Sequence, residues 1–266
     1  MKFGVCGGLD LMPLLAQHGY DYLELSVDGL LKPTEDEAAF KVALARLQAG
    51  PLPCLALNCL LPGSMKVVGP AVDGAALQRH VRTVCTRAQR AGVPIVVFGS
   101  GGARTVPDGF ERARAFTQLR AFCLMLGQTA AAHHVTIAVE PLRRRECNLL
   151  TTITETAALV RAVHHPAIRL LVDAFHWSQE NETTDAIIAN ADLIVHTHIA
   201  TTAHRKAPGS EDCDFGAFFA ALRAAHYHGT MSIEADLNTA SESLPRALAL
   251  LSVLSERGVG AAEFKV

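Results

Sequence analysis

The sequence lacks the features by which nucleic-acid-binding, membrane and disulfide-stabilised proteins are usually recognised. Its 24 basic residues against 26 acidic ones leave a formal charge of −2, and the only basic block is the short run at 143–145. A nucleic-acid partner normally requires a basic face. No apolar run is long enough to span a membrane or to form the core of a signal peptide. We therefore expect a soluble, cytoplasmic protein with neither a nucleic-acid nor a membrane partner.

Paired cysteines and nucleotide-binding motifs are also missing. The seven cysteines are scattered without a C-x-x-C pair, which favours free thiols in a reducing cytosol. Gly7-Gly8 does not provide the G-x-G-x-x-G turn of a dinucleotide site, and the glycine-rich run at 99–104 lacks the Gly-Lys-Ser/Thr ending of a P-loop. We interpret that run as a tight turn.

What the sequence does contain is a regular alternation of strand-like and helix-like segments. Half of its residues are apolar, which is enough for a large core. Apolar runs predict eight strands, at residues 2–6, 20–26, 54–59, 94–98, 135–140, 168–173, 193–198 and 230–234. Helix-period segments lie at residues 9–18, 35–48, 74–91, 110–133, 154–163, 185–189, 215–226 and 244–257.

Alternation of this kind implies parallel strands joined by right-handed crossovers. Eight such units without a composition break predict an α/β fold, a single (β/α)8 TIM barrel domain over residues 1–266. A doubly wound open sheet is the competing architecture, but Glu24, near the end of the second strand, has no glycine turn to support it as a ribose-binding acid. The longest loops, at 60–73, 99–109, 176–184 and 200–214, would all lie on the face where barrels build active sites.

Four strands in succession carry a candidate metal ligand near their carboxyl ends. These residues are Glu140, Asp173, His198 and Glu234, and separations of 33, 25 and 36 residues place each about one βα unit from the next. A lone strand-end carboxylate is more often a helix cap and a lone histidine more often a core residue, so the prediction depends on all four being in phase. Three carboxylates and one imidazole suit Mn²⁺, with Mg²⁺ or Co²⁺ as alternatives, better than structural zinc.

Three further residues are candidates for holding a substrate. His176 follows the sixth strand by three residues and is expected to hydrogen-bond a substrate oxygen. Glu146 could orient a substrate hydroxyl or share its proton, and Arg205 could bind a hydroxyl, carboxylate or phosphate. His196 is expected to face away from His198, and we give packing and site roles equal weight for it.

Several motifs resemble those of the xylose isomerase-like barrel superfamily: Val-Glu-Pro-Leu at 139–142, the Asp173–His176 pair, His-Thr-His at 196–198 and Ser-Ile-Glu at 232–234. The resemblance covers essentially the whole chain and is closest to the sugar phosphate isomerase/epimerase branch, which includes ketose 3-epimerases and hydroxypyruvate isomerases. It implies a divalent-metal-dependent isomerase or epimerase that acts through an enediolate on a small ketose, aldose or keto acid, with or without a phosphate. Relatives are often homo-oligomers.

The resemblance also implies individual roles. It gives metal ligation to Glu140, Asp173, His198 and Glu234, acid/base catalysis to Glu140 and Glu234, and substrate binding to Glu146, His176 and Arg205.

Two departures from the family pattern keep other hypotheses open. Ala200 stands where relatives often have an acidic residue, and Phe175 and Trp177 give a bulky aromatic rim around His176. Both leave room for a substrate with an apolar part, so a lyase or dehydratase, such as a deglycosidase of 3-keto C-glycosides, is the second hypothesis. A phosphodiesterase would need more ligands on the first three strands, which offer only Glu24. A sugar sensor would not need paired carboxylates.

Overall fold

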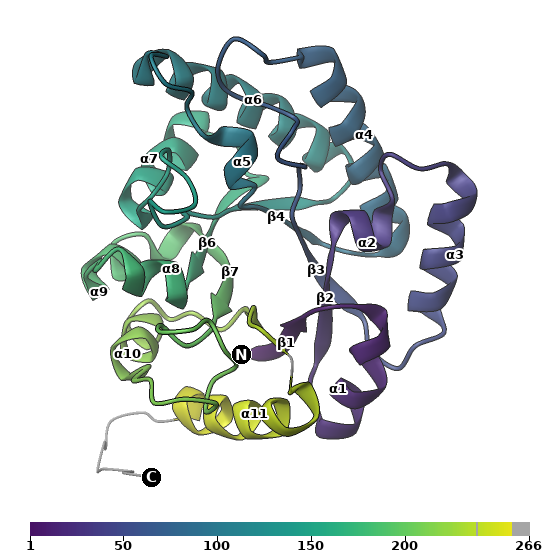
Figure 1. Ribbon diagram of the computed structural model, residues 1–266, viewed down its shortest axis with the longest axis vertical. Coiled ribbons are helices and arrows are strands. Elements are labelled where there is room, and N and C mark those ends of the chain that lie inside the picture. Colours follow the sequence, from purple (N-terminus) through teal and green to yellow (C-terminus); the bar gives the residue numbers. More distant parts are fainter. Residues whose placement is uncertain (238, 257–266) are drawn as a thin grey trace.

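A closed ring of eight parallel strands occupies the centre of the molecule, with the helices outside it (Figure 1). The computed structural model describes residues 1–237 and 239–256. β1 pairs with β8 as well as with β2, which closes the barrel. The strands are β1 Lys2–Cys6, β2 Tyr22–Ser26, β3 Cys54–Asn58, β4 Ile95–Phe98, β5 Thr136–Val139, β6 Ile168–Asp173, β7 Ile194–Ile199 and β8 Thr230–Ile233. The barrel expected from the sequence is confirmed.

Each predicted strand segment overlaps one of these strands, and only β7 extends past its predicted end, by one residue. The segments were recognisable because runs of Val, Ile and Leu are needed where both faces of a sheet are covered. The ends of the last four strands set the positions of the candidate ligands. Glu140 and Glu234 directly follow β5 and β8, Asp173 is the last residue of β6, and His198 is the last but one of β7. Since all eight strands run parallel, these residues reach the same rim of the barrel.

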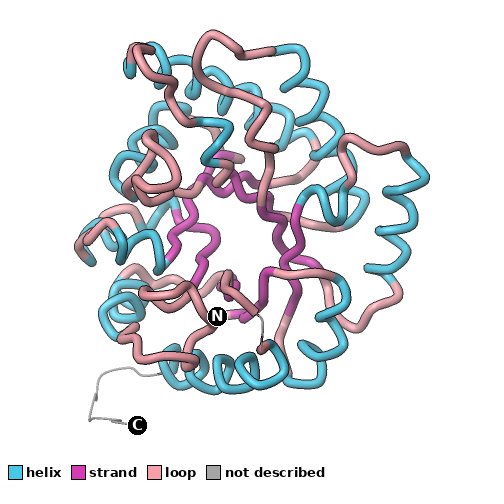
Figure 2. The backbone as a smooth tube through the Cα atoms, in the orientation of Figure 1, coloured by secondary structure: helices cyan, strands magenta, loops and turns pink. Residues whose placement is uncertain are grey.

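The helices form the outer layer that Figure 2 shows around the strands. They are α1 Met12–His18, α2 Val27–Leu31, α3 Glu37–Gln48, α4 Gly74–Ala91, α5 Gly101–Arg104, α6 Arg112–Ala132, α7 Ile153–Val163, α8 Ala174–Gln179, α9 Thr184–Ile188, α10 Gly216–Ala224 and α11 Ala240–Glu256, with short 3-10 turns η1 Leu9–Leu11 and η2 Ala191–Leu193. None of the helices in residues 1–237 and 239–256 combines the length and the hydropathy that a membrane span requires.

Three short helices were not predicted from the sequence. α2 and α8 follow β2 and β6 directly, and α5 replaces the tight turn expected in the glycine-rich run after β4. The helices that were predicted are all present within a few residues of their expected ends. The last predicted helix residue, 257, lies outside the described residues. α4 ends where Gly92 adopts a left-handed conformation with φ 71°, as its sequence predicts.

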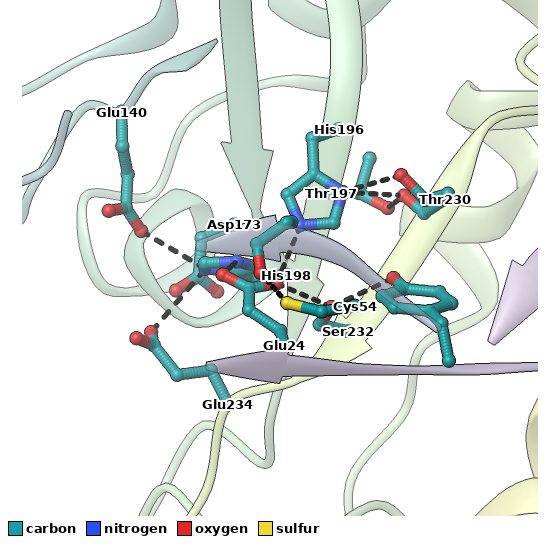
Figure 3. Close-up of polar contacts among 12 residues, drawn as sticks. Glu24, Cys54, Glu140, Asp173, His196, Thr197, His198, Thr230, Ser232 and Glu234 are labelled. Carbon is teal, nitrogen blue, oxygen red and sulfur yellow. Dashed lines mark hydrogen bonds and ion pairs between the residues drawn. The ribbon is translucent and has the colours of Figure 1, made fainter. Parts of the chain in front are cut away.

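The core has two parts. A large cluster fills the space between the strands and the surrounding helices. A small separate cluster of Val97, Ala138 and Leu171, from β4, β5 and β6, is covered by Ile95 and Val195. Residues of β2, β7 and β8 instead form a buried polar network, which lies directly beside the candidate ligands (Figure 3).

Candidate active site

The four predicted ligands meet at one rim of the barrel. Ligand atoms of Glu140, Asp173, His198 and Glu234 all lie within 4.8 Å of one another. His198 Nδ1 is 3.5 Å from a carboxylate oxygen of Glu140 and 3.5 Å from one of Glu234, which approach it from two sides (Figure 3). The structure therefore places together the four residues that the sequence singled out.

The unpaired atoms of this cluster fit a metal ion. Among the described residues, six buried side-chain atoms lack a hydrogen-bond partner, and three of them are Glu140 Oε1, Asp173 Oδ2 and His198 Nδ1. Buried polar atoms are rarely left without a partner, because the lost hydration is costly. The other Asp173 oxygen is already engaged, since it accepts a 2.7 Å hydrogen bond from the Phe175 amide. Oxygen and imidazole ligands of this kind suit Mn²⁺, Mg²⁺ or Co²⁺.

The cluster brings three carboxylates close together, so their negative charges repel one another. Burial raises the pKa of Asp173 to about 6, and the charge of Glu234 adds to the rise. Burial alone would also raise the pKa of Glu234, but His198 and Arg205 outweigh it and lower the pKa to about 2. A bound divalent cation would relieve this repulsion, because it would be the largest local charge in the site.

His176 directs a hydrogen-bond donor at the same place. Its Nε2 lies 3.7 Å from Asp173 Oδ2 and 3.9 Å from Glu140 Oε1, and it has no hydrogen-bond partner. The Arg143 amide donates to His176 Nδ1 at 3.2 Å, so the ring proton of the neutral imidazole is on Nε2. Burial lowers the pKa of His176, which keeps the ring neutral. His176 is therefore suited to donate to a ligand oxygen, as expected.

Arg205 and Glu146 lie at the edge of the cluster. The Arg205 guanidinium forms an ion pair with Glu234 and lies 3.6 Å from Asp173 Oδ2 and 3.8 Å from Glu146 Oε1. Glu146 also accepts a 2.7 Å hydrogen bond from Arg143 Nε. His176 and Arg205 thus lie next to the candidate ligands, and Glu146 is linked to them through Arg205.

The two aromatic residues that flank His176 have different surroundings. Phe175 is 2% exposed and lies under two guanidinium groups, those of Arg143 at 4.6 Å and Arg205 at 4.8 Å from its ring centre. The Trp177 ring packs on Phe218, and its Nε1 donates to the Thr183 carbonyl. Phe175 also packs edge to face on the His176 ring, with the ring centres 5.3 Å apart, whereas Trp177 packs towards α10. A substrate with an apolar part stays a prediction.

Two residues that were not predicted from the sequence determine the position of Glu140, one by hydrogen bonding and one by leaving space. Arg104 is fully buried, and its guanidinium donates to the Phe98 carbonyl at 3.2 Å and to the Glu140 carbonyl at 2.6 Å. A methyl group at Gly99 would lie 2.3 Å from Glu140 Oε2, so the carboxylate fits only because Gly99 has no side chain. A glycine directly after a buried strand is the signal for this close approach.

Glu24 and His196 form a second buried layer behind His198. Glu24 is 0% exposed and accepts from His198 Nε2 at 3.1 Å, from His196 Nε2 at 2.8 Å and from Ser232 Oγ at 2.6 Å. Burial alone would raise the pKa of Glu24, but the two imidazoles lower it well below its usual range. The expectation that His196 faces away from His198 was wrong, because alternate residues of a strand share a face.

Comparison with known proteins assigns the family. The model of the xylose isomerase-like TIM barrel matches residues 12–252. The chain belongs to the xylose isomerase-like TIM barrel family. This confirms the resemblance seen in the sequence motifs.

Two relatives can be aligned with most of the chain. L-ribulose 3-epimerase of Mesorhizobium japonicum is 34% identical over 225 residues, which cover 81% of this chain and 71% of the relative. L-ribulose 3-epimerase of Methylomonas sp. strain DH-1 is 27% identical over 222 residues, covering 82% and 75%. Epimerases are isomerases, so these relatives confirm the expected class of enzyme, a sugar isomerase or epimerase.

A solved structure of similar fold is that of D-psicose 3-epimerase from Clostridium cellulolyticum H10, with D-tagatose. Its TM-score is 0.83 at 17% identity, and the match covers 97% of this chain and all of the other. At this level of identity the comparison establishes the shared barrel.

Proposed function

We propose that this family member is a divalent-metal-dependent epimerase that inverts a carbon next to the carbonyl group of a small ketose. One observation carries the proposal: the unpaired ligand atoms of Glu140, Asp173 and His198 converge with Glu234 at one point of the rim. Such a set fits a hard cation, Mn²⁺ in our proposal, with Mg²⁺ or Co²⁺ as substitutes. The names of the relatives, L-ribulose 3-epimerases, support a ketose as substrate and C3 as the reacting carbon.

Epimerisation requires proton transfer on both faces of one carbon. A bound divalent cation would polarise the ketose carbonyl and stabilise the enediolate that forms when the neighbouring carbon loses its proton. Glu140 and Glu234 belong to strand ends three units apart in the ring and approach His198 Nδ1 from two sides. We assign one of them to remove the proton and the other to return it on the opposite face.

The remaining polar groups hold the substrate. The Nε2–H group of His176 is free to donate to a sugar oxygen. The guanidinium of Arg205 presents its donors between Glu234 and Glu146, where it can bind a second oxygen or stabilise negative charge as it develops. Glu146 is outside the ligand cluster and is assigned to a substrate hydroxyl. A homo-oligomer, expected from the family resemblance, stays a prediction.

The test is product analysis with a panel of substrates and metals. Purified protein is stripped with EDTA, reloaded with Mn²⁺, Mg²⁺ or Co²⁺, and incubated with L-ribulose, D-fructose, D-tagatose and a 3-keto glycoside. We expect C3 epimers of one or more ketoses, lost after EDTA treatment and restored by Mn²⁺. Equal turnover in EDTA would contradict the metal requirement. Release of an aglycone from the 3-keto glycoside, without epimerisation of any ketose, would favour the lyase hypothesis instead.

A further inference from the structure

Glu24 is a charged residue where the barrel should be apolar. It lies in the middle of β2, in the sequence Tyr-Leu-Glu-Leu, and is 0% exposed. A buried carboxylate is costly unless several donors surround it. The register between β2 and β3 shifts next to Glu24, and that between β6 and β7 shifts next to His196. Irregularities of this kind re-aim side chains next to functional sites.

The position of Glu24 is fixed by residues from other strands. One oxygen accepts from both Ser232 Oγ, at 2.6 Å, and His196 Nε2, at 2.8 Å. Ser232 Oγ is in turn 2.8 Å from the hydroxyl of Tyr22, and His196 Nδ1 is 2.7 Å from Thr230 Oγ1. The carboxylate is therefore held by a chain of hydrogen-bonded side chains from β2, β7 and β8.

The remaining oxygen of Glu24 faces the candidate ligand. Glu24 Oε1 lies 3.1 Å from His198 Nε2, while His198 Nδ1, on the opposite edge of the same ring, lacks a hydrogen-bond partner and faces Glu140 and Glu234 (Figure 3). A carboxylate can only accept, so the nitrogen facing it must carry the proton. In a neutral imidazole the lone pair is then on Nδ1, the atom that faces the cluster.

We infer that Glu24 is a positioning residue that fixes the orientation and tautomer of His198, so that the Nδ1 lone pair is presented to a metal ion. The inference rests on the metal centre proposed above. Carboxylates behind metal-binding histidines orient the ring and raise its basicity, and their loss typically weakens metal binding 10- to 100-fold. Glu24 does not touch the reacting atoms.

An alternative use of the same residues is a second cation site. Ligand atoms of Cys6, Glu24 and His198 lie within 4.8 Å of one another. Both oxygens of Glu24 already accept hydrogen bonds, however, and burial with the neighbouring charge of Glu24 raises the pKa of the Cys6 thiol well above its usual range. The thiol is therefore held protonated, which favours the positioning role.

Two substitutions of Glu24 separate charge from shape. Glu24→Gln keeps the size of the side chain but presents an amide, whose NH₂ group competes for the lone pair of His198 Nε2. Glu24→Asp keeps the acceptor but leaves a gap. Isothermal titration calorimetry of the full chain with Mn²⁺ alone should show 10- to 100-fold weaker binding for Glu24→Gln, with Glu24→Asp retaining more affinity than Glu24→Gln. Glu182→Gln is the matched carboxylate-to-amide control and should bind like the wild type. Glu182 lies between α8 and α9, and its carboxylate accepts from the Ile153 amide at the start of α7.

A packing role for Glu24 predicts the reverse order, with Glu24→Gln close to wild type and Glu24→Asp weaker, and that order would overturn the inference. Two Mn²⁺ ions per chain, with the second lost in Cys6→Ser, would also overturn it. A second test needs no Glu24 variant: long-range ¹⁵N NMR of wild-type His198, with the signals assigned by comparison with His198→Asn. Nε2 should be protonated both without metal and with Mg²⁺. An unprotonated Nε2 would refute the inference. Absence of any Mn²⁺ binding by the wild type would instead refute the proposed metal centre, whatever the NMR shows.

Discussion

Gly99→Ala should damage the candidate active site while leaving the fold intact. The new methyl carbon would lie 2.3 Å from Glu140 Oε2, about 1.1 Å closer than the 3.4 Å at which ordinary contact begins. Gly99 is not among the glycines with positive φ, so alanine fits its backbone without strain. The carboxylate is the nearest group, and it must therefore move by about 1 Å. Metal ligands tolerate errors of only about 0.2 Å, and a misplacement of about 1 Å can cost about 100-fold in rate.

The assay compares two functions of the same variant with its stability. We expect Mn²⁺ affinity, measured by calorimetry, and turnover of the ketose substrate to fall, with turnover about 100-fold lower. The free energy of unfolding, measured with urea, should stay within about 1 kcal/mol of wild type, since glycine-to-alanine changes at compatible positions are neutral or mildly stabilising. Gly74→Ala is the matched control, because a methyl group there meets no atom within 4 Å. Wild-type turnover and metal affinity in Gly99→Ala would refute this account of how Glu140 is placed.

Three further predictions follow from buried or paired groups. Arg104→Met leaves the Glu140 carbonyl without its 2.6 Å donor, so the free energy of unfolding in urea should fall by about 1–3 kcal/mol. An unchanged free energy of unfolding would show that Arg104 does not stabilise this position. Burial raises the pKa of Glu182 to about 7, above its ordinary 4.5, so its contribution to stability is present below pH 4.5 and lost as pH rises through 7. Glu182→Gln should therefore flatten this part of the pH–stability curve. An identical slope in the variant would contradict the raised pKa. Glu146→Gln should lower turnover with Mn²⁺ affinity nearly intact, and loss of metal would place Glu146 among the ligands.

The fold could be predicted because its signal is repeated eight times. Each βα unit carries its own apolar strand and helix period, so an error of two residues at one end, as at the start of β2, does not change the count. The short helices were missed for a local reason. α2, α5 and α8 have only five, four and six residues, too few to show a helical period, and two of them continue directly from a strand.

The candidate ligands could be predicted because each lies within one residue of the end of a strand, and parallel strands bring their ends together. The residues that form hydrogen bonds to these ligands could not be predicted. Glu24 and His198 are 174 positions apart, and Arg104 and Glu140 are 36 apart, so only closure of the barrel and packing of α5 show which groups meet. A charged residue inside an apolar strand was a usable sign that Glu24 has partners, although it does not name them. The identities of those partners came only from the structure.

The central claim is that the protein moves a proton at a carbon next to a ketone, with the help of a metal ion. Its most direct test is incubation of the Mn²⁺-loaded protein with L-ribulose in D₂O, followed by NMR and mass analysis of the sugar. The account predicts one deuterium at C3 of the epimerised product, and none after EDTA treatment. An epimer that contains no deuterium, or deuterium that enters C3 equally well in EDTA, would contradict it.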